Sequence, residues 1–132
     1  MRKICSFAMG VVLALLGSVV YAHAQKATEQ FIPIAESPGV SNKLTVIGEI
    51  DQYDAEAKTV TIATPAGKQT FNLTEKTKIY LDRTKLRLRN LEGKFGDLRK
   101  GRRAEVKFKD QEGKTNTDWV KIEMTEPGPG NN

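Results

Sequence analysis

The feature that most constrains the fold is the alternation of residue types over residues 48–64. Two stretches of alternating apolar and polar side chains are joined there by an acidic turn, residues 54–58. In the second stretch Val60 and Ile62 share one face, and β-branched residues dominate it, which favours a strand. Successive side chains of a strand point to opposite faces, so the pattern predicts a hairpin with one buried face.

The same period of two recurs along most of the chain. It predicts strands over residues 44–51, 59–64, 68–73, 77–82, 102–109 and 115–124, with turns at residues 65–67 and 110–113. Gly48, inside the first strand, indicates a bulge or a sharp bend.

Residues 83–101 lack this period. Leu91, Phe95 and Leu98 fall there at helical spacing, and three glycines limit a helix to a turn or two. A sheet of six short strands can remove its edges by curling into a barrel. We therefore predict an all-β fold over residues 43–124, a small antiparallel five- to six-stranded OB-like barrel with one short helical turn that plugs its end.

The first 24 residues have the pattern of a secretory signal peptide. Arg2 and Lys3 precede the apolar residues 4–20, and residues 22–24, Ala-His-Ala, suit a signal peptidase. We expect cleavage before Gln25, a periplasmic or secreted protein, and no transmembrane segment after cleavage. An uncleaved anchor is the alternative, because the apolar stretch is at the short limit for a spanning helix.

Two segments flank the predicted barrel. Residues 25–42 have no sustained period and are punctuated by Pro33, Pro38 and Gly39, which indicates a flexible, mostly extended N-terminal arm. Residues 125–132, rich in Gly, Pro and Asn, are expected to form a disordered tail.

Cleavage would remove most residues that carry chemistry. Cys5 and His23, the only cysteine and histidine, would leave, and Met124 would be the only methionine. Nucleophilic catalysis needs a base beside the nucleophile, and the two remaining serines, Ser37 and Ser41, lie in the arm. We therefore predict that the protein is not an enzyme, with no catalytic residues and no cofactor.

An acidic group surrounds the first hairpin. Asp51, Asp54 and Glu56 supply oxygen ligands of the kind that Ca²⁺ prefers, but their spacing matches no EF-hand loop. The alternative is a solvated acidic turn in which Asp54 caps the backbone. No metal site is predicted here.

Three motifs resemble a known family. They are G-x-I-x-x-x-D-x-x-x-x-T-V-T-I at residues 48–62, the stretch of residues 96–106, and the glycine turn followed by residues 119–122. Together they resemble small OB-like β-barrel domains of exported bacterial proteins, domains of unknown function with no assigned activity. They are also distantly similar to the periplasmic copper/silver chaperones of efflux systems, and this resemblance implies a metal-handling protein as the alternative function.

The copper resemblance can be tested against the ligands it implies. Those chaperones hold a soft monovalent ion with histidine and methionine thioethers beside a tryptophan, because soft ligands select that ion. After cleavage the chain would offer Trp119 and Met124 but no histidine and no cysteine. The usual ligands are therefore missing.

Basic residues concentrate between residues 76 and 103. This stretch holds eleven Lys and Arg against three Asp and Glu, whereas the mature chain as a whole would carry a charge of +3. Such a patch attracts anionic ligands and acidic partners. Tyr80 and Trp119 fall at positions that point outward, and their rings could add stacking surfaces. The predicted binding residues are Lys78, Arg83, Lys85, Arg87, Arg89, Arg99, Arg102, Arg103, Tyr80 and Trp119.

These patterns predict a non-catalytic, exported binding module that engages an envelope protein or an anionic ligand through its basic face. Nucleic acid is not the expected partner, because an exported protein seldom meets it. The alternative is a merely solvated face, since lysines on strand surfaces also prevent edge-to-edge aggregation.

Overall fold

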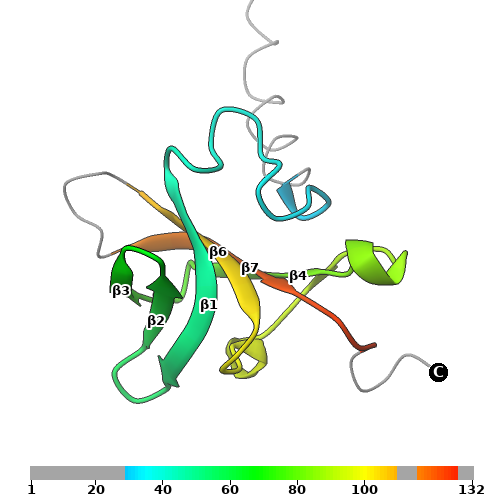
Figure 1. Cartoon of the computed structure of the whole chain (residues 1–132). Coiled ribbons are helices and arrows are strands. Elements are labelled where there is room, and N and C mark those ends of the chain that lie inside the picture. The colour runs from blue at the N-terminus through cyan, green and yellow to red at the C-terminus, as the bar shows by residue number, and fades with distance from the viewer. Residues whose placement is uncertain (1–28, 110–115, 128–132) are drawn as a thin grey trace, which may run out of the picture.

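The computed structural model describes residues 29–109 and 116–127 (Figure 1). Within these ranges, no helix has the length and apolar character needed to cross a bilayer. The predicted signal peptide, the predicted turn at residues 110–113 and most of the predicted tail lie outside the described residues. The elements are β1 Thr45–Asp54, β2 Thr59–Thr64, β3 Gly67–Asn72, β4 Lys78–Asp82, η1 Thr84–Leu86, β5 Leu91–Glu92, η2 Phe95–Asp97, β6 Arg103–Phe108 and β7 Thr117–Glu123, where η denotes a 3₁₀ helix.

The all-β class is confirmed, but the predicted barrel is not. The strands form one seven-stranded sheet in the order β3-β2-β1-β6-β7-β4-β5, with β3 and β5 at its two ends. The sheet is mixed, because β4 pairs with β7 in parallel while the other pairs are antiparallel. An isolated bridge from Asn72 to Asn116 brings the end of β3 back beside the start of β7 without continuing the ladder.

The differences from the predicted barrel have local causes. β5 has two residues, too few for an alternating pattern to be visible in the sequence. Residues 84–86 form a 3₁₀ helix, η1, so the irregular stretch of residues 83–101 holds two 3₁₀ helices instead of the single predicted helical turn. η2 behaves as predicted: Leu98 directly after it is buried in the core, and Phe95 packs against the same cluster.

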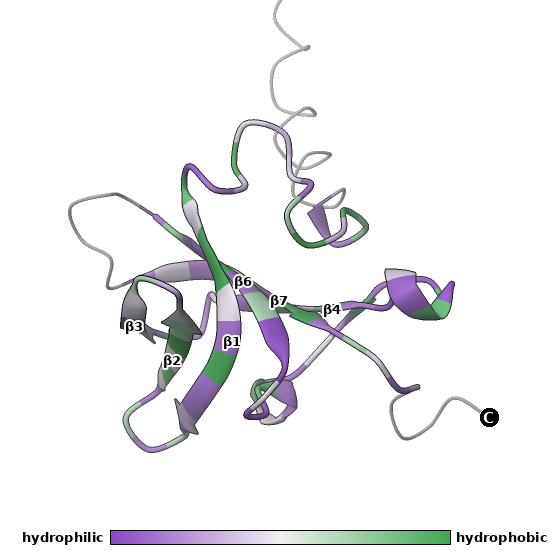
Figure 2. Ribbon diagram, viewed as in Figure 1, coloured by the Kyte–Doolittle hydropathy of each residue, from purple (hydrophilic) through white to green (hydrophobic). Residues whose placement is uncertain are grey.

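The inner face of the sheet forms the core. Hydrophobic and polar residues alternate along the strands (Figure 2), and the apolar positions that the sequence assigns to the interior, such as Ile50, Val60 and Ile122, are fully buried. Phe71 of β3 stacks on Phe108 of β6 with ring centroids 6.2 Å apart. Burying such side chains contributes about 1.5–3 kcal/mol each, so this face stabilises the sheet.

Gly48 has a different role from the predicted bend. A Cβ atom at this position would lie 2.3 Å from the carbonyl oxygen of Ala63 and 2.7 Å from Cγ2 of Ile62, both on β2. The glycine therefore permits a close approach of β1 to β2. The irregularity in their pairing occurs two residues later, between Ile50 and Gln52.

Side chains on the outer face form three rows across β1, β6, β7 and β4, as the pairing of these strands requires. The first row is Thr45, Lys107, Trp119 and Lys78; the second is Ile47, Glu105, Lys121 and Tyr80; the third is Glu49, Arg103, Glu123 and Asp82. The outward parity predicted for Tyr80, Trp119 and Glu105 is thus confirmed.

The sequence predicts an extended N-terminal arm, but the described part of the arm is not extended. Residues 29–44 form consecutive turns, with the N–H groups of Glu36, Ser41 and Leu44 bonded to carbonyl groups three or four residues earlier. These turns lie across the outer face of the sheet (Figure 1). The arm takes this path because side chains of the sheet bond its backbone and hydroxyl groups.

Candidate binding surfaces

Two predicted binding residues that are distant in sequence meet at one carboxylate. Lys85 lies in η1 and Arg103 begins β6, yet both contact Glu123 at the end of β7. Lys85 Nζ is 2.8 Å from Glu123 Oε1, and Arg103 Nη1 is 3.2 Å from Glu123 Oε2. The loop of residues 84–89 and the loop of residues 99–103 therefore flank the end of β7, which lies between β4 and β6.

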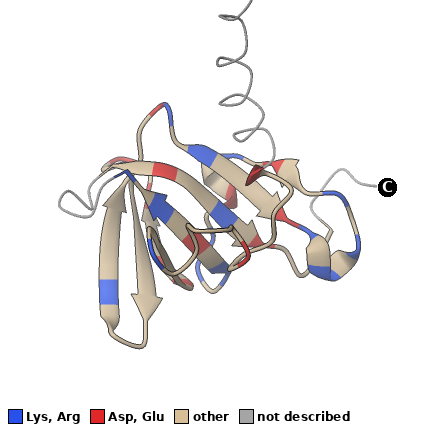
Figure 3. Cartoon of the chain, turned by 90° about the horizontal axis from the view of Figure 1, so that it is seen from above, with Lys and Arg blue, Asp and Glu red and all other residues tan. Residues whose placement is uncertain are grey.

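Further cations belong to the same two loops as Lys85 and Arg103. Arg87 caps the C-terminus of η1 in the left-handed conformation, and Arg99 and Lys100 occupy the exposed turn before β6. Arg102 Nη1 donates to the carbonyl oxygen of Asp97 at 3.0 Å. Figure 3 shows basic residues on η1 and, interleaved with acidic residues, on the strands of the sheet. We define the basic cluster as Lys85, Arg87, Arg99, Lys100, Arg102 and Arg103.

Three other predicted residues are engaged elsewhere in the chain. Arg83 is buried rather than exposed, and its Nε donates to the carbonyl oxygen of Arg89 at 2.8 Å. The guanidinium carbon of Arg89 lies 4.9 Å from the ring centre of Phe31 in the arm. Lys78 pairs with Glu92 at 3.3 Å. These side chains stabilise loops and the arm instead of extending the cluster.

The predicted aromatic stacking surface is not exposed. Trp119 is 7% exposed and Tyr80 8%, and their ring centroids are 6.5 Å apart. Lys121 Nζ lies 4.4 Å from the centre of the Trp119 ring. Burial, together with the carboxylates of Glu92 and Glu29, raises the pKa of Tyr80. Stacking on a ligand needs a free ring face, so these two residues are not available to a partner in this arrangement.

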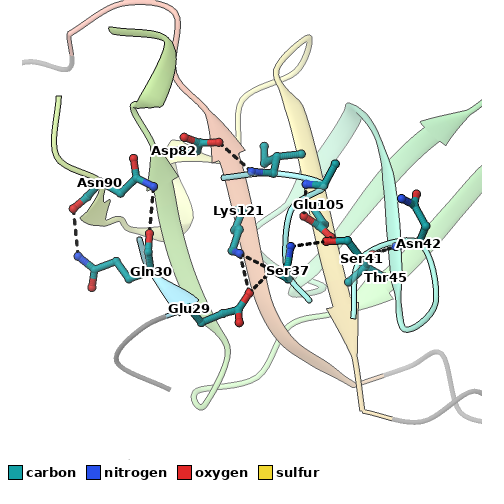
Figure 4. A network of polar contacts seen from close by, with 12 residues as sticks. Glu29, Gln30, Ser37, Ser41, Asn42, Thr45, Asp82, Asn90, Glu105 and Lys121 are labelled. Atoms are coloured by element: carbon teal, nitrogen blue, oxygen red, sulfur yellow. Dashed lines mark hydrogen bonds and ion pairs between the residues drawn. The ribbon is translucent and has the colours of Figure 1, made fainter. Parts of the chain in front are cut away.

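The arm supplies the partners of a buried lysine. Lys121 is 1% exposed, and its Nζ is 2.6 Å from Glu29 Oε1 and 2.9 Å from Ser37 Oγ (Figure 4). The Ser37 hydroxyl also donates to Glu29. One carboxylate and one hydroxyl of the arm thus surround the ammonium group.

Two acidic residues of the sheet bind the arm directly. Glu105, which is fully buried, accepts from the N–H of Ala35 at 2.8 Å and from the hydroxyl of Ser41 at 2.6 Å. Asp82 Oδ2 accepts from the N–H of Ile34 at 2.9 Å. We call the surface formed by Asp82, Glu105 and Lys121 the arm-binding face (Figure 4).

Sequence reasoning missed the arm-binding face. The alternation places Glu105 on the outer face but cannot show what covers it. A charged residue at an outward position is ordinarily solvated, so no local signal distinguished Glu105 and Lys121 from the exposed lysines beside them.

The acidic turn of the first hairpin is structural. Asp54 Oδ1 accepts from the N–H groups of Glu56 and Ala57, both at 3.0 Å, which confirms the predicted cap. Asp51 pairs with Lys68 of β3 at 3.2 Å. Asp54 therefore caps the turn of the hairpin, and Asp51 links the hairpin to β3.

The described residues do not match the donor set of a soft metal ion. Over residues 29–109 and 116–127, no three His, Cys, Asp or Glu side chains are grouped so that they could hold a metal. Met124, the single thioether expected in the mature chain, is buried among the apolar side chains of the inner face.

No protein-family model matches the chain, and no curated protein matches it. Two solved structures align with part of the chain. The crystal structure of Ag(I)CusF is 20% identical and covers 59% of this chain and 93% of its own, with a TM-score of 0.39. A Cu(II) structure of a tryptophan-to-alanine CusF variant from Escherichia coli is 20% identical and covers 60% of this chain and 89% of its own, also with a TM-score of 0.39.

Proposed function

We propose that the protein is a non-catalytic, exported module that binds an acidic envelope protein or another anionic ligand through the basic cluster. The convergence of Lys85 and Arg103 on Glu123 supports this proposal, because it joins two loops into one cationic surface. Export rests on the predicted signal peptide.

The cluster has the properties that electrostatic recognition needs. Its cations are mostly exposed, and the ion pairs that Glu123 makes with two of them leave an excess of positive charge. A concentrated charge of one sign raises the local concentration of oppositely charged partners and speeds their encounter. Since salt screens exposed charges over about 8–10 Å, binding through this surface should weaken at high ionic strength.

The test compares two triple variants of equal net charge. Arg87→Glu/Arg99→Glu/Lys100→Glu reverses three exposed cations of the cluster, and Lys43→Glu/Lys58→Glu/Lys68→Glu reverses three exposed lysines outside it. Residues 25–132 of each would be applied to a heparin column and to vesicles of equal parts neutral and anionic phospholipid.

We expect the cluster variant to elute from heparin at clearly lower salt than the control variant, and to lose vesicle binding if the anionic ligand is a lipid surface. If both variants shift equally, only net charge matters and the cluster is not a binding site. If neither shifts, the basic residues serve solubility alone.

A further inference from the structure

The arm-binding face contacts the arm mainly through groups that many protein segments carry. Asp82 and Glu105 each accept a backbone N–H, from Ile34 and Ala35. Every residue except proline offers such a donor. Lys121 adds a requirement for a carboxylate, which Glu29 meets.

The arm is held chiefly by polar contacts. Among residues 29–41 the buried apolar side chain is Ile34, and the other buried residue is Ser37. Hydrogen bonds formed within a protein replace hydrogen bonds to water, so each contributes little net free energy. A buried ion pair such as Glu29–Lys121 roughly offsets the cost of desolvating its two charges. The arm is therefore the kind of segment that a competing ligand can displace.

We propose that the arm-binding face is a peptide-recognition surface, and that residues 29–41 occupy it as an intramolecular ligand. The external partner is a segment of another protein with the chemistry of the arm: a carboxylate that reaches Lys121, two consecutive backbone N–H groups five and six residues later, and a small hydroxyl residue after them. This surface is separate from the basic cluster, so the two proposals can fail independently.

The chain carries its own reporter for this exchange. Trp119, the only tryptophan, lies against Lys121 on the same face. Movement of the arm or arrival of a ligand changes the surroundings of this ring, and its fluorescence emission should respond.

The experiment uses residues 25–132 and a synthetic peptide of residues 29–42 as the probe. Glu29→Gln removes the carboxylate that pairs with Lys121, and Glu36→Gln is the matched control, an exposed carboxylate of the same arm. Losing a hydrogen bond to a charged group corresponds to about a tenfold change in affinity or more. We expect the peptide to bind Glu29→Gln about tenfold more tightly than it binds wild type or Glu36→Gln, with a change in Trp119 emission.

A second peptide, in which Gln replaces Glu29, should bind the Glu29→Gln protein less tightly than the first peptide does. Absence of peptide binding to a folded Glu29→Gln protein would overturn the proposal, and so would equal binding to both Gln variants. A concentration-dependent dimer, detected by light scattering in the wild type and abolished by Lys121→Met, would identify the arm of a second copy as the occupant and overturn the heterologous partner.

Amide exchange in the wild type gives a test that needs no variant. If the arm is displaceable, the N–H groups of Ile34 and Ala35 should exchange at least tenfold faster than those of Val120 and Ile122, because locally opening segments exchange without global unfolding. Equal protection of all four would show that the arm opens only when the domain unfolds, and would contradict the proposal.

Discussion

The arm-binding face lies on the strands β4, β6 and β7, whereas the basic cluster lies on η1 and on the turn that leads into β6. The two polar surfaces differ in the source of their counter-charges. On the arm-binding face, Lys121 receives its counter-charge from Glu29 of the arm and is 1% exposed. In the basic cluster, Lys85 and Arg103 share Glu123, and their side chains remain 65% and 46% exposed.

The comparison shows that burial by the arm, rather than the type of side chain, decides whether a charged residue needs a partner within the protein. A buried ammonium needs a partner, because removing it from water is costly, so Lys121 is committed to the arm or to a substitute for it. Exposed ion pairs contribute only about 0–1 kcal/mol to stability. Most cations of the cluster are exposed to solvent, so the fold depends less on them than on Lys121.

The largest expected effect is on the free energy of unfolding, and it differs between two consecutive residues of β7. Ile122 is fully buried on the inner face, and Ile122→Ala should reduce the free energy of unfolding by about 2–5 kcal/mol. Lys121→Ala should cost about 1–3 kcal/mol, because its loss is limited to the contacts of the arm, whose freed Glu29 can turn to solvent. Urea unfolding measures both; equal costs would mean that the arm is part of the core.

Removing the carboxylate from the cluster should strengthen binding. Glu123→Gln leaves Lys85 and Arg103 without a counter-charge, so the protein should elute from heparin at higher salt. Because the Glu123 side chain is 10% exposed, the change should also reduce the free energy of unfolding, by about 1–3 kcal/mol. Glu92→Gln is the control, because Glu92 pairs with Lys78 outside the cluster. If both variants gain retention equally, the position of Glu123 has no special role.

The smallest expected effect concerns Tyr80. Its pKa is raised from 10.0 by burial and by the carboxylates of Glu92 and Glu29. As the pH rises above 10.0, the unfolded chain loses the phenol proton before the folded chain does, so unfolding releases a proton and stability falls. This contribution is complete below the unfolded pKa and is lost as the pH passes the raised pKa of the folded state.

The measurement is urea unfolding at several values between pH 9 and about pH 11. Tyr80→Phe should lose less stability over this range than the wild type, and Tyr53→Phe, on β1, is the control. If the free energy of unfolding falls equally with pH in all three proteins, the pKa of Tyr80 is not raised by its burial and by the carboxylates of the arm and β5.

The strands could be located from the sequence because their signal is local. The prediction of residues 59–64 agrees with β2, and that of residues 102–109 exceeds β6 by one residue at each end. The inner face followed from the same alternation. The parallel pairing of β4 with β7 could not be foreseen, because it joins residues about forty positions apart that carry no local mark of their partner.

The binding surfaces were predictable in part. Lys85, Arg87, Arg99, Arg102 and Arg103 were predicted and belong to the basic cluster, although only the fold shows that Glu123 joins their loops. The contact from Glu29 to Lys121 spans 92 positions, and no periodicity relates residues so distant. For the same reason the burial of Tyr80 and Trp119 was missed while their outward parity was correct.

NMR can distinguish binding of an anionic partner at the basic cluster from binding at the arm-binding face. Backbone amide shifts of residues 25–132 would be followed during titration with a heparin oligosaccharide. We expect the largest changes within residues 84–89 and 99–103, with little change at Ile34, Ala35 and Lys121. Changes centred on those three amides, or spread evenly over all exposed lysines, would contradict binding at the basic cluster.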